Sequence, residues 1–103
     1  MASTSRSNDP SLLILTSLAS GPKHGYALFQ DIESFSGQRL GPGTLYGAIG
    51  RLEERGLIEG MVPEGRTRPY RLTSAGQESL ETALAELREL VDVGTKRLVG
   101  RFA

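Results

Sequence analysis

Hydrophobic positions along this chain fall into groups that glycine and proline residues separate. The first group is the apolar run Leu12–Leu15, followed by Leu18, and it is too dense for a surface helix. Asp9 can cap the free backbone N–H groups ahead of this run, and Pro10 suits the first position of a helix. The pattern therefore predicts a buried helix that starts at Asp9-Pro10 and stops at the breaker sequence of residues 20–22.

Two further helices follow from the same periodicity. The segment 25–35 spaces its apolar side chains three, four and seven positions apart, at Tyr26, Leu28, Phe29, Ile32 and Phe35. A turn at residues 41–43 opens the next helix, which is predicted to run to about Arg55. Its single apolar face consists of Leu45, Ala48, Ile49 and Leu52. Gly56 is well placed as a left-handed stop after that helix.

The remaining pattern predicts a hairpin and a long last helix. Two short extended segments, 57–62 and 69–72, flank a turn that contains proline and glycine. The last helix begins at Thr73-Ser74 and reaches Val99, and only Gly94 interrupts it. Ser74 fits a capping box with Gln77, although Thr73 could equally be the cap.

These elements predict a mainly α fold with a β-hairpin wing, in the order of a winged helix-turn-helix followed by a long C-terminal helix. Residues 10–73 form the winged helix in this interpretation, and residues 74–103 form the last helix and a tail. The small polar residues 1–9 predict a disordered leader.

Composition narrows the possible functions of a chain of 103 residues, which predicts one domain or one domain with an extension. Twelve Lys and Arg balance twelve Asp and Glu, so a basic site must be local. The absence of Cys excludes disulfides and thiolate sites, and a single His argues against a histidine-based zinc site. No phosphate-loop or paired-carboxylate motif is present, and no apolar run is long enough for a membrane span. We therefore expect a cytoplasmic protein without a metal, a cofactor, a membrane partner or catalytic activity.

Three segments in order resemble the PadR-type transcriptional regulators: LLILTSLASGPKHGYAL (12–28), GPGTLYGAIGRLEERGLIE (41–59) and RPYRLTSAG (68–76). The resemblance implies a DNA-binding winged helix and a dimer made through the C-terminal helix. It also implies repression of transcription, usually relieved by a small molecule. The chain is similar to the compact branch of the family, which has a single C-terminal helix.

The third helix carries the first group of candidate DNA contacts. Its face opposite the apolar side chains is centred on glycines, including Gly47 and Gly50, which permit close approach to a DNA groove. The alternative is that these glycines allow tight packing against another helix. Beside them, Arg51 is a candidate for phosphate or guanine, and Thr44 and Tyr46 are candidates for phosphate.

Two more groups of candidates lie outside that helix. The predicted wing holds Arg66, Thr67 and Arg68, and residues 39–71 carry a net charge of +2, whereas residues 74–93 carry −4. At the start of the second helix, Lys23 and Tyr26 match the family's motif and are candidates for DNA contact. Tyr26 could equally be a core ring, and the neighbouring His is expected to be packed or capping.

The last helix has a seam of apolar residues with alternating spacings of four and three, which suits helix pairing. Its members are Leu80, Leu84, Leu87, Val91, Gly94 and Leu98. At 1.5 Å per residue the helix measures about 39 Å, longer than a small winged domain can cover. The seam and two leucines of the first helix, Leu12 and Leu15, are therefore predicted to form a dimer interface, with the coiling ending near Val93.

The sequence thus predicts a sequence-specific, dimeric DNA-binding repressor that recognises a palindromic operator on double-stranded DNA. The alternative is a winged helix that binds another protein and not DNA. A small apolar effector between the subunits is a further expectation. Phe102 and the leucines of the first helix could line its pocket, or the interface could simply be closed.

Overall fold

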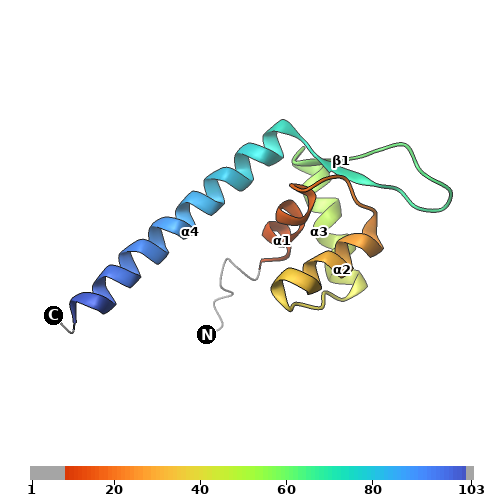
Figure 1. Cartoon of the computed structure of the whole chain (residues 1–103). Coiled ribbons are helices and arrows are strands. Elements are labelled where there is room, and N and C mark those ends of the chain that lie inside the picture. Colours follow the sequence, from red (N-terminus) through yellow and green to blue (C-terminus); the bar gives the residue numbers. More distant parts are fainter. Residues whose placement is uncertain (1–8, 102–103) are drawn as a thin grey trace.

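The computed structural model describes residues 9–101 as a winged helix from which one long helix extends (Figure 1). Within this range the chain forms α1 (Pro10–Leu18), α2 (Gly25–Ser36), α3 (Pro42–Glu54), β1 (Ile58–Gly60), β2 (Tyr70–Leu72) and α4 (Ser74–Gly100). The predicted mainly α fold with a hairpin wing is confirmed. The expected disordered leader, apart from Asp9, lies outside the described residues, and so does Phe102.

The helix ends follow local chemistry that the sequence shows. The Asp9 carboxylate accepts a hydrogen bond from the Ser11 N–H at 2.9 Å and thereby caps α1. At the start of α2, Nδ1 of His24 accepts a hydrogen bond from the Ala27 N–H at 3.4 Å, which makes His24 a capping residue. Gly56 has a φ of 72°, so the predicted left-handed stop after α3 is also present.

One hydrophobic core joins the three short helices, the hairpin and the start of α4. α1 contacts α2, α3 and α4, and its apolar side chains are all buried: Leu12, Leu13, Ile14, Leu15 and Leu18. This packing does not support the dimer interface predicted at Leu12 and Leu15. Their side chains are only 9% and 4% exposed, so they offer a partner almost no surface.

The wing is a hairpin with a short ladder and a long tip. β1 and β2 pair antiparallel with Gly60 opposite Tyr70, and the strands are shorter than the predicted segments 57–62 and 69–72. Proline residues in both arms of the hairpin cannot donate ladder hydrogen bonds, which limits the pairing. On its other side Tyr70 bridges to Lys23 through two backbone hydrogen bonds of 2.9 and 3.1 Å. The hairpin is thereby fastened to the connector between α1 and α2.

α4 starts against the base of the wing. The cap is Thr73, whose hydroxyl accepts a hydrogen bond from the Gly76 N–H at 3.0 Å, so the capping box of Ser74 and Gln77 does not form. The helix continues without interruption through Gly94.

The two ends of α4 have different surroundings, because the helix projects beyond the other elements (Figure 1). The molecule measures 60 × 27 × 24 Å as a result. We divide it into the body, residues 9–87, and the overhang, residues 88–101, in which every residue except Val93 is exposed.

Candidate nucleic-acid interface

α2 and α3 form the helix-turn-helix, and the Tyr46 side chain of α3 reaches Gly25 at the start of α2. A Cβ at Gly25 would collide with the hydroxyl end of Tyr46, so a side chain at this position would force Tyr46 to move. α3 buries Leu45, Ile49 and Leu52 in the core. Its opposite face is therefore fixed in direction and turned to solvent.

The exposed face of α3 contains all of its predicted DNA contacts. Thr44, Tyr46, Gly47 and Arg51 are exposed, and Gly50 is half-exposed. A Cβ at Gly50 would meet nothing within 4 Å, and one at Gly47 would meet only the Arg51 guanidinium at 3.5 Å. Within residues 9–101 the glycines therefore do not serve helix packing, and they leave a strip without side chains beside Arg51.

The wing carries the second cationic group. Arg66, Thr67 and Arg68 are all exposed at or beside a tight turn, in which Gly65 has a φ of 63°. The Thr67 hydroxyl donates to the Glu64 carbonyl at 2.9 Å, so part of its hydrogen-bonding capacity holds the turn.

Tyr70 joins the wing to α3. Burial raises the pKa of its hydroxyl, and the Glu53 carboxylate raises it further, whereas the Arg68 guanidinium lowers it. Tyr46 also raises the pKa by a smaller amount. Side chains of α3 and of the wing thus lie near enough to affect one hydroxyl, and α3 packs directly against strand β1 of the wing.

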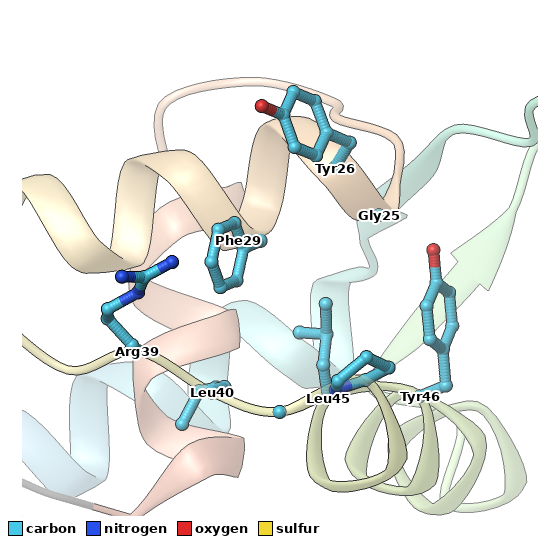
Figure 2. A pocket seen from close by; sticks show the side chains of 9 residues that line it. Gly25, Tyr26, Phe29, Arg39, Leu40, Leu45 and Tyr46 are labelled. Atoms are coloured by element: carbon cyan, nitrogen blue, oxygen red, sulfur yellow. The ribbon is translucent and has the colours of Figure 1, made fainter.

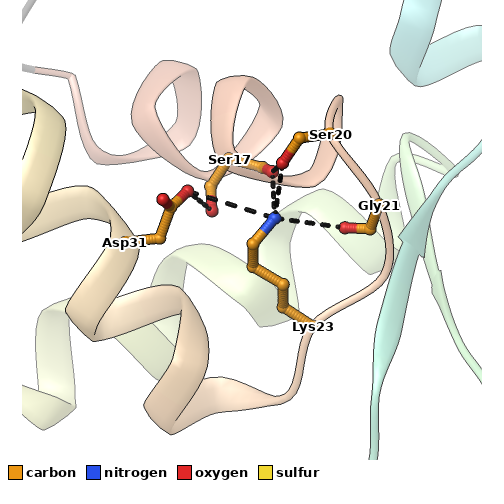
Figure 3. Close-up of polar contacts among 5 residues, drawn as sticks. All are labelled: Ser17, Ser20, Gly21, Lys23 and Asp31. Carbon is orange, nitrogen blue, oxygen red and sulfur yellow. Dashed lines mark hydrogen bonds and ion pairs between the residues drawn. The ribbon is translucent and has the colours of Figure 1, made fainter.

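Lys23 differs from its expected role as a phosphate contact. Figure 3 shows its ammonium among acceptors of its own chain. It donates to the Ser17 carbonyl at 2.6 Å, the Ser20 hydroxyl at 2.8 Å and the Gly21 carbonyl at 3.3 Å, and lies 4.0 Å from the Asp31 carboxylate. The side chain is only 18% exposed. Lys23 therefore closes the loop between α1 and α2, and we do not retain it as a DNA contact.

A hollow of about 450 Å³ separates the N-terminal ends of α2 and α3 (Figure 2). Phe29 points into it from α2, while Tyr46 rises from α3 toward Gly25. Tyr26 is 63% exposed and stacks on Phe29 with ring centroids 6.2 Å apart, so it is a surface ring and not a core ring.

Arg39 is a lining residue of this hollow that sequence reasoning did not single out. Its guanidinium lies 5.8 Å from the Phe29 ring centroid, and its Nε lies 3.2 Å from a Glu33 carboxylate oxygen. The available signal was its position two residues before the turn that opens α3. Arg39 therefore adds a cation to the hollow that Tyr26 and Tyr46 also line.

The predicted seam of α4 divides between the body and the overhang. Leu80 is 6% exposed and Leu87 is partly buried, because both pack on the core of their own chain. Leu84, Val91 and Leu98 are 45–62% exposed, and Gly94 is also exposed. Leu90 and Val99, outside the seam, are equally exposed. The free apolar surface is thus shifted toward the C-terminal end, and Leu80 is removed from it.

Two other classes of site receive no support from residues 9–101. No group of three or more His, Asp or Glu side chains in this range could hold a metal ion. None of the helices in the same range is both long and apolar enough to cross a bilayer.

Comparisons with known proteins agree with the fold. The profile of the transcriptional regulator PadR-like family matches residues 14–82. The transcriptional regulator Rv3488 of Mycobacterium tuberculosis is 43% identical over 82 residues, which cover 77% of this chain and 76% of that protein. The crystal structure of a PadR family transcription regulator from Clostridium difficile R20291 has a TM-score of 0.78 and is 26% identical. That likeness covers 86% of this chain and 97% of the other.

A further relative is much longer than this chain. It is an uncharacterized 37.1 kDa protein in transposon TN4556 of Streptomyces fradiae, and it is 54% identical over 76 residues. The match covers 74% of this chain but only 22% of that protein, so the chain spans about a fifth of this relative's length.

Proposed function

Because this chain belongs to the PadR-like family of transcriptional regulators, we propose that it is a dimeric repressor that binds specific sites on double-stranded DNA. The observation that carries the proposal is a set of exposed arginines on α3 and on the wing, two elements that contact each other through β1. Arg51 on α3 and Arg66 and Arg68 on the wing are exposed, and they take part in none of the ion pairs within residues 9–101. Such cations are available to neutralise phosphates.

In this proposal the exposed face of α3 enters the major groove. Its glycine strip lets the helix lie deep, and the Arg51 guanidinium reaches a guanine edge or a phosphate. The hydroxyls of Thr44, Tyr46 and Tyr26 donate to phosphates at the rim of the groove, while Arg66, Thr67 and Arg68 contact the neighbouring backbone or minor groove. A bound repressor of this kind acts by occupying its operator.

The proposed dimer uses the overhang. Its exposed leucine and valine side chains form an apolar surface that no other part of residues 9–101 covers. One winged domain makes few phosphate contacts, and affinity in the nonspecific range is about 10⁻⁴–10⁻⁶ M. Two domains on one two-fold axis can bind half-sites about 34 Å apart, so the second binds at high effective concentration.

The salt dependence of DNA binding tests the proposal. Replacing Arg66 and Arg68 by Ala removes up to four charges from a dimer, so the slope of log K against log salt should flatten by up to about 3.6. Arg71→Ala is the matched control, because Arg71 is on the wing but pairs with Glu59 at 3.1 Å. An unchanged slope in a folded double variant would exclude the wing from the DNA surface.

A further inference from the structure

Gly60 lies under the side chain of a wing arginine. It is the last residue of β1 and stands opposite Tyr70 in the ladder. A Cβ at Gly60 would lie 2.6 Å from Nη2 of Arg68 and closer still to Nε and Cζ. The guanidinium therefore occupies the space that any other residue at position 60 would fill with its side chain.

The backbone gives no other reason for glycine at this position. The glycines with positive φ in residues 9–101 are Gly21, Gly37, Gly56 and Gly65, and Gly60 is not among them. Glycine weakens the interior of a strand unless a neighbouring group must approach closely. Here the close neighbour is the end of Arg68.

The position of the Arg68 guanidinium relates the wing to α3. Arg68 lies on the tip side of the ladder, and its side chain reaches back over Gly60 toward the base of the wing. There it lies over β1, the strand of the wing that contacts α3, and it lowers the pKa of the Tyr70 hydroxyl. The cation is thus directed toward α3 and away from the free end of the wing.

We propose that Gly60 is a positioning residue for DNA binding. By lacking a side chain it seats the Arg68 guanidinium at the junction of the wing and α3, so that both elements contact the same stretch of DNA backbone. This inference rests on the proposed function, because it requires Arg68 to contact DNA. An arginine side chain has considerable rotamer freedom. Holding the Arg68 guanidinium in place before binding reduces the conformational entropy that is lost when it contacts DNA.

Gly60→Ala tests the proposal, since the added methyl group displaces the Arg68 guanidinium and leaves every charge in the protein. The collision is with the flexible end of a side chain, so the fold should persist, and Ala should suit the strand better than Gly. We expect an unchanged or higher Tm together with a loss of operator affinity of about threefold to tenfold. In an Arg68→Ala background, Gly60→Ala should cause no further loss.

Arg68→Lys provides a second test of the positioning role without a change at Gly60. Lysine keeps the charge but not the planar group, so most of the salt slope should remain while affinity falls to the level of Gly60→Ala. Wild-type affinity in Gly60→Ala, or an equal loss with and without Arg68, would overturn the positioning role while leaving the DNA contact of Arg68 intact. Wild-type affinity and salt slope in Arg68→Ala would overturn the contact itself, and with it the positioning role.

Discussion

The body and the overhang share one helix but bury its residues differently. At the start of α4, Gly76 lies against the Leu57 carbonyl, and Leu80 is 6% exposed. Three turns or more further on, Val91 and Leu98 follow the same seam yet are 62% and 59% exposed. Helical periodicity therefore identifies which residues share a face, but only the length of the underlying domain decides which of them are covered.

Gly76 and Gly94, two of the three glycines of α4, should show this difference most strongly. A Cβ at Gly76 would collide with the Leu57 carbonyl oxygen and lie 2.9 Å from Cδ1 of Leu72, and a backbone carbonyl cannot move aside as a side chain can. We expect Gly76→Ala to lower the free energy of unfolding by about 4 kcal/mol or to prevent folding. Gly94→Ala, where a Cβ meets nothing within 4 Å, should raise it by up to about 1 kcal/mol.

Denaturant unfolding of both variants at the same protein concentration measures the contrast. Circular dichroism should show higher helix content for Gly94→Ala than for the wild type. A well-folded Gly76→Ala with wild-type stability would mean that the base of α4 can shift away from the wing. The contact between the base of α4 and the wing would then be less rigid than the packing around Gly76 indicates.

Sequence patterns predicted the elements and their caps because these depend on neighbouring residues. Asp9, His24 and Gly56 each act within a few positions along the chain. Burial along a seam is different, because Leu80 and Leu98 have the same periodicity and differ only in what lies beside them. Information of that kind is three-dimensional and is not present in the spacing.

In the candidate site, too, features set by neighbouring residues were predictable and features set by three-dimensional packing were not. The exposed residues of α3 and the wing were predictable, since they lie opposite an apolar face or in a turn. The contacts of Lys23 within its own chain were not predictable, because its acceptors come from the end of α1 and from Asp31 on α2. A cation in a family motif looks the same in sequence whether it faces DNA or its own chain.

Two leucines of α4 provide the next comparison. Leu80→Ala removes a side chain from the core and should lower the free energy of unfolding by about 2–5 kcal/mol at any protein concentration. Leu98→Ala should leave the body intact and weaken only the proposed dimer, by tenfold or more in its dissociation constant.

Analytical ultracentrifugation over a range of concentrations separates the two effects. The loss of stability relative to the wild type should depend on protein concentration for Leu98→Ala, which weakens the proposed dimer, and should not depend on it for Leu80→Ala. A dimer dissociation constant unchanged by Leu98→Ala would place the subunit interface away from this part of the overhang.

Two lysines give the smallest expected contrast. Lys23→Met keeps the apolar stem but removes the donor shared by Ser17 and Ser20, and charged hydrogen bonds of this type contribute about 1.5–3 kcal/mol. We expect thermal and denaturant unfolding to show a loss of about 2 kcal/mol. Lys96→Met, on the exposed overhang, should change the free energy of unfolding by less than about 0.5 kcal/mol.

Measuring DNA binding by Lys23→Met then decides whether Lys23 only stabilises the fold or also contacts DNA. Because the ammonium faces acceptors of its own chain, the slope of log K against log salt should equal that of the wild type. A slope flatter by about 1.8, the value for two lost phosphate contacts per dimer, would show that the loop opens and that Lys23 turns to DNA. The closed arrangement of the body would then apply to the free protein alone.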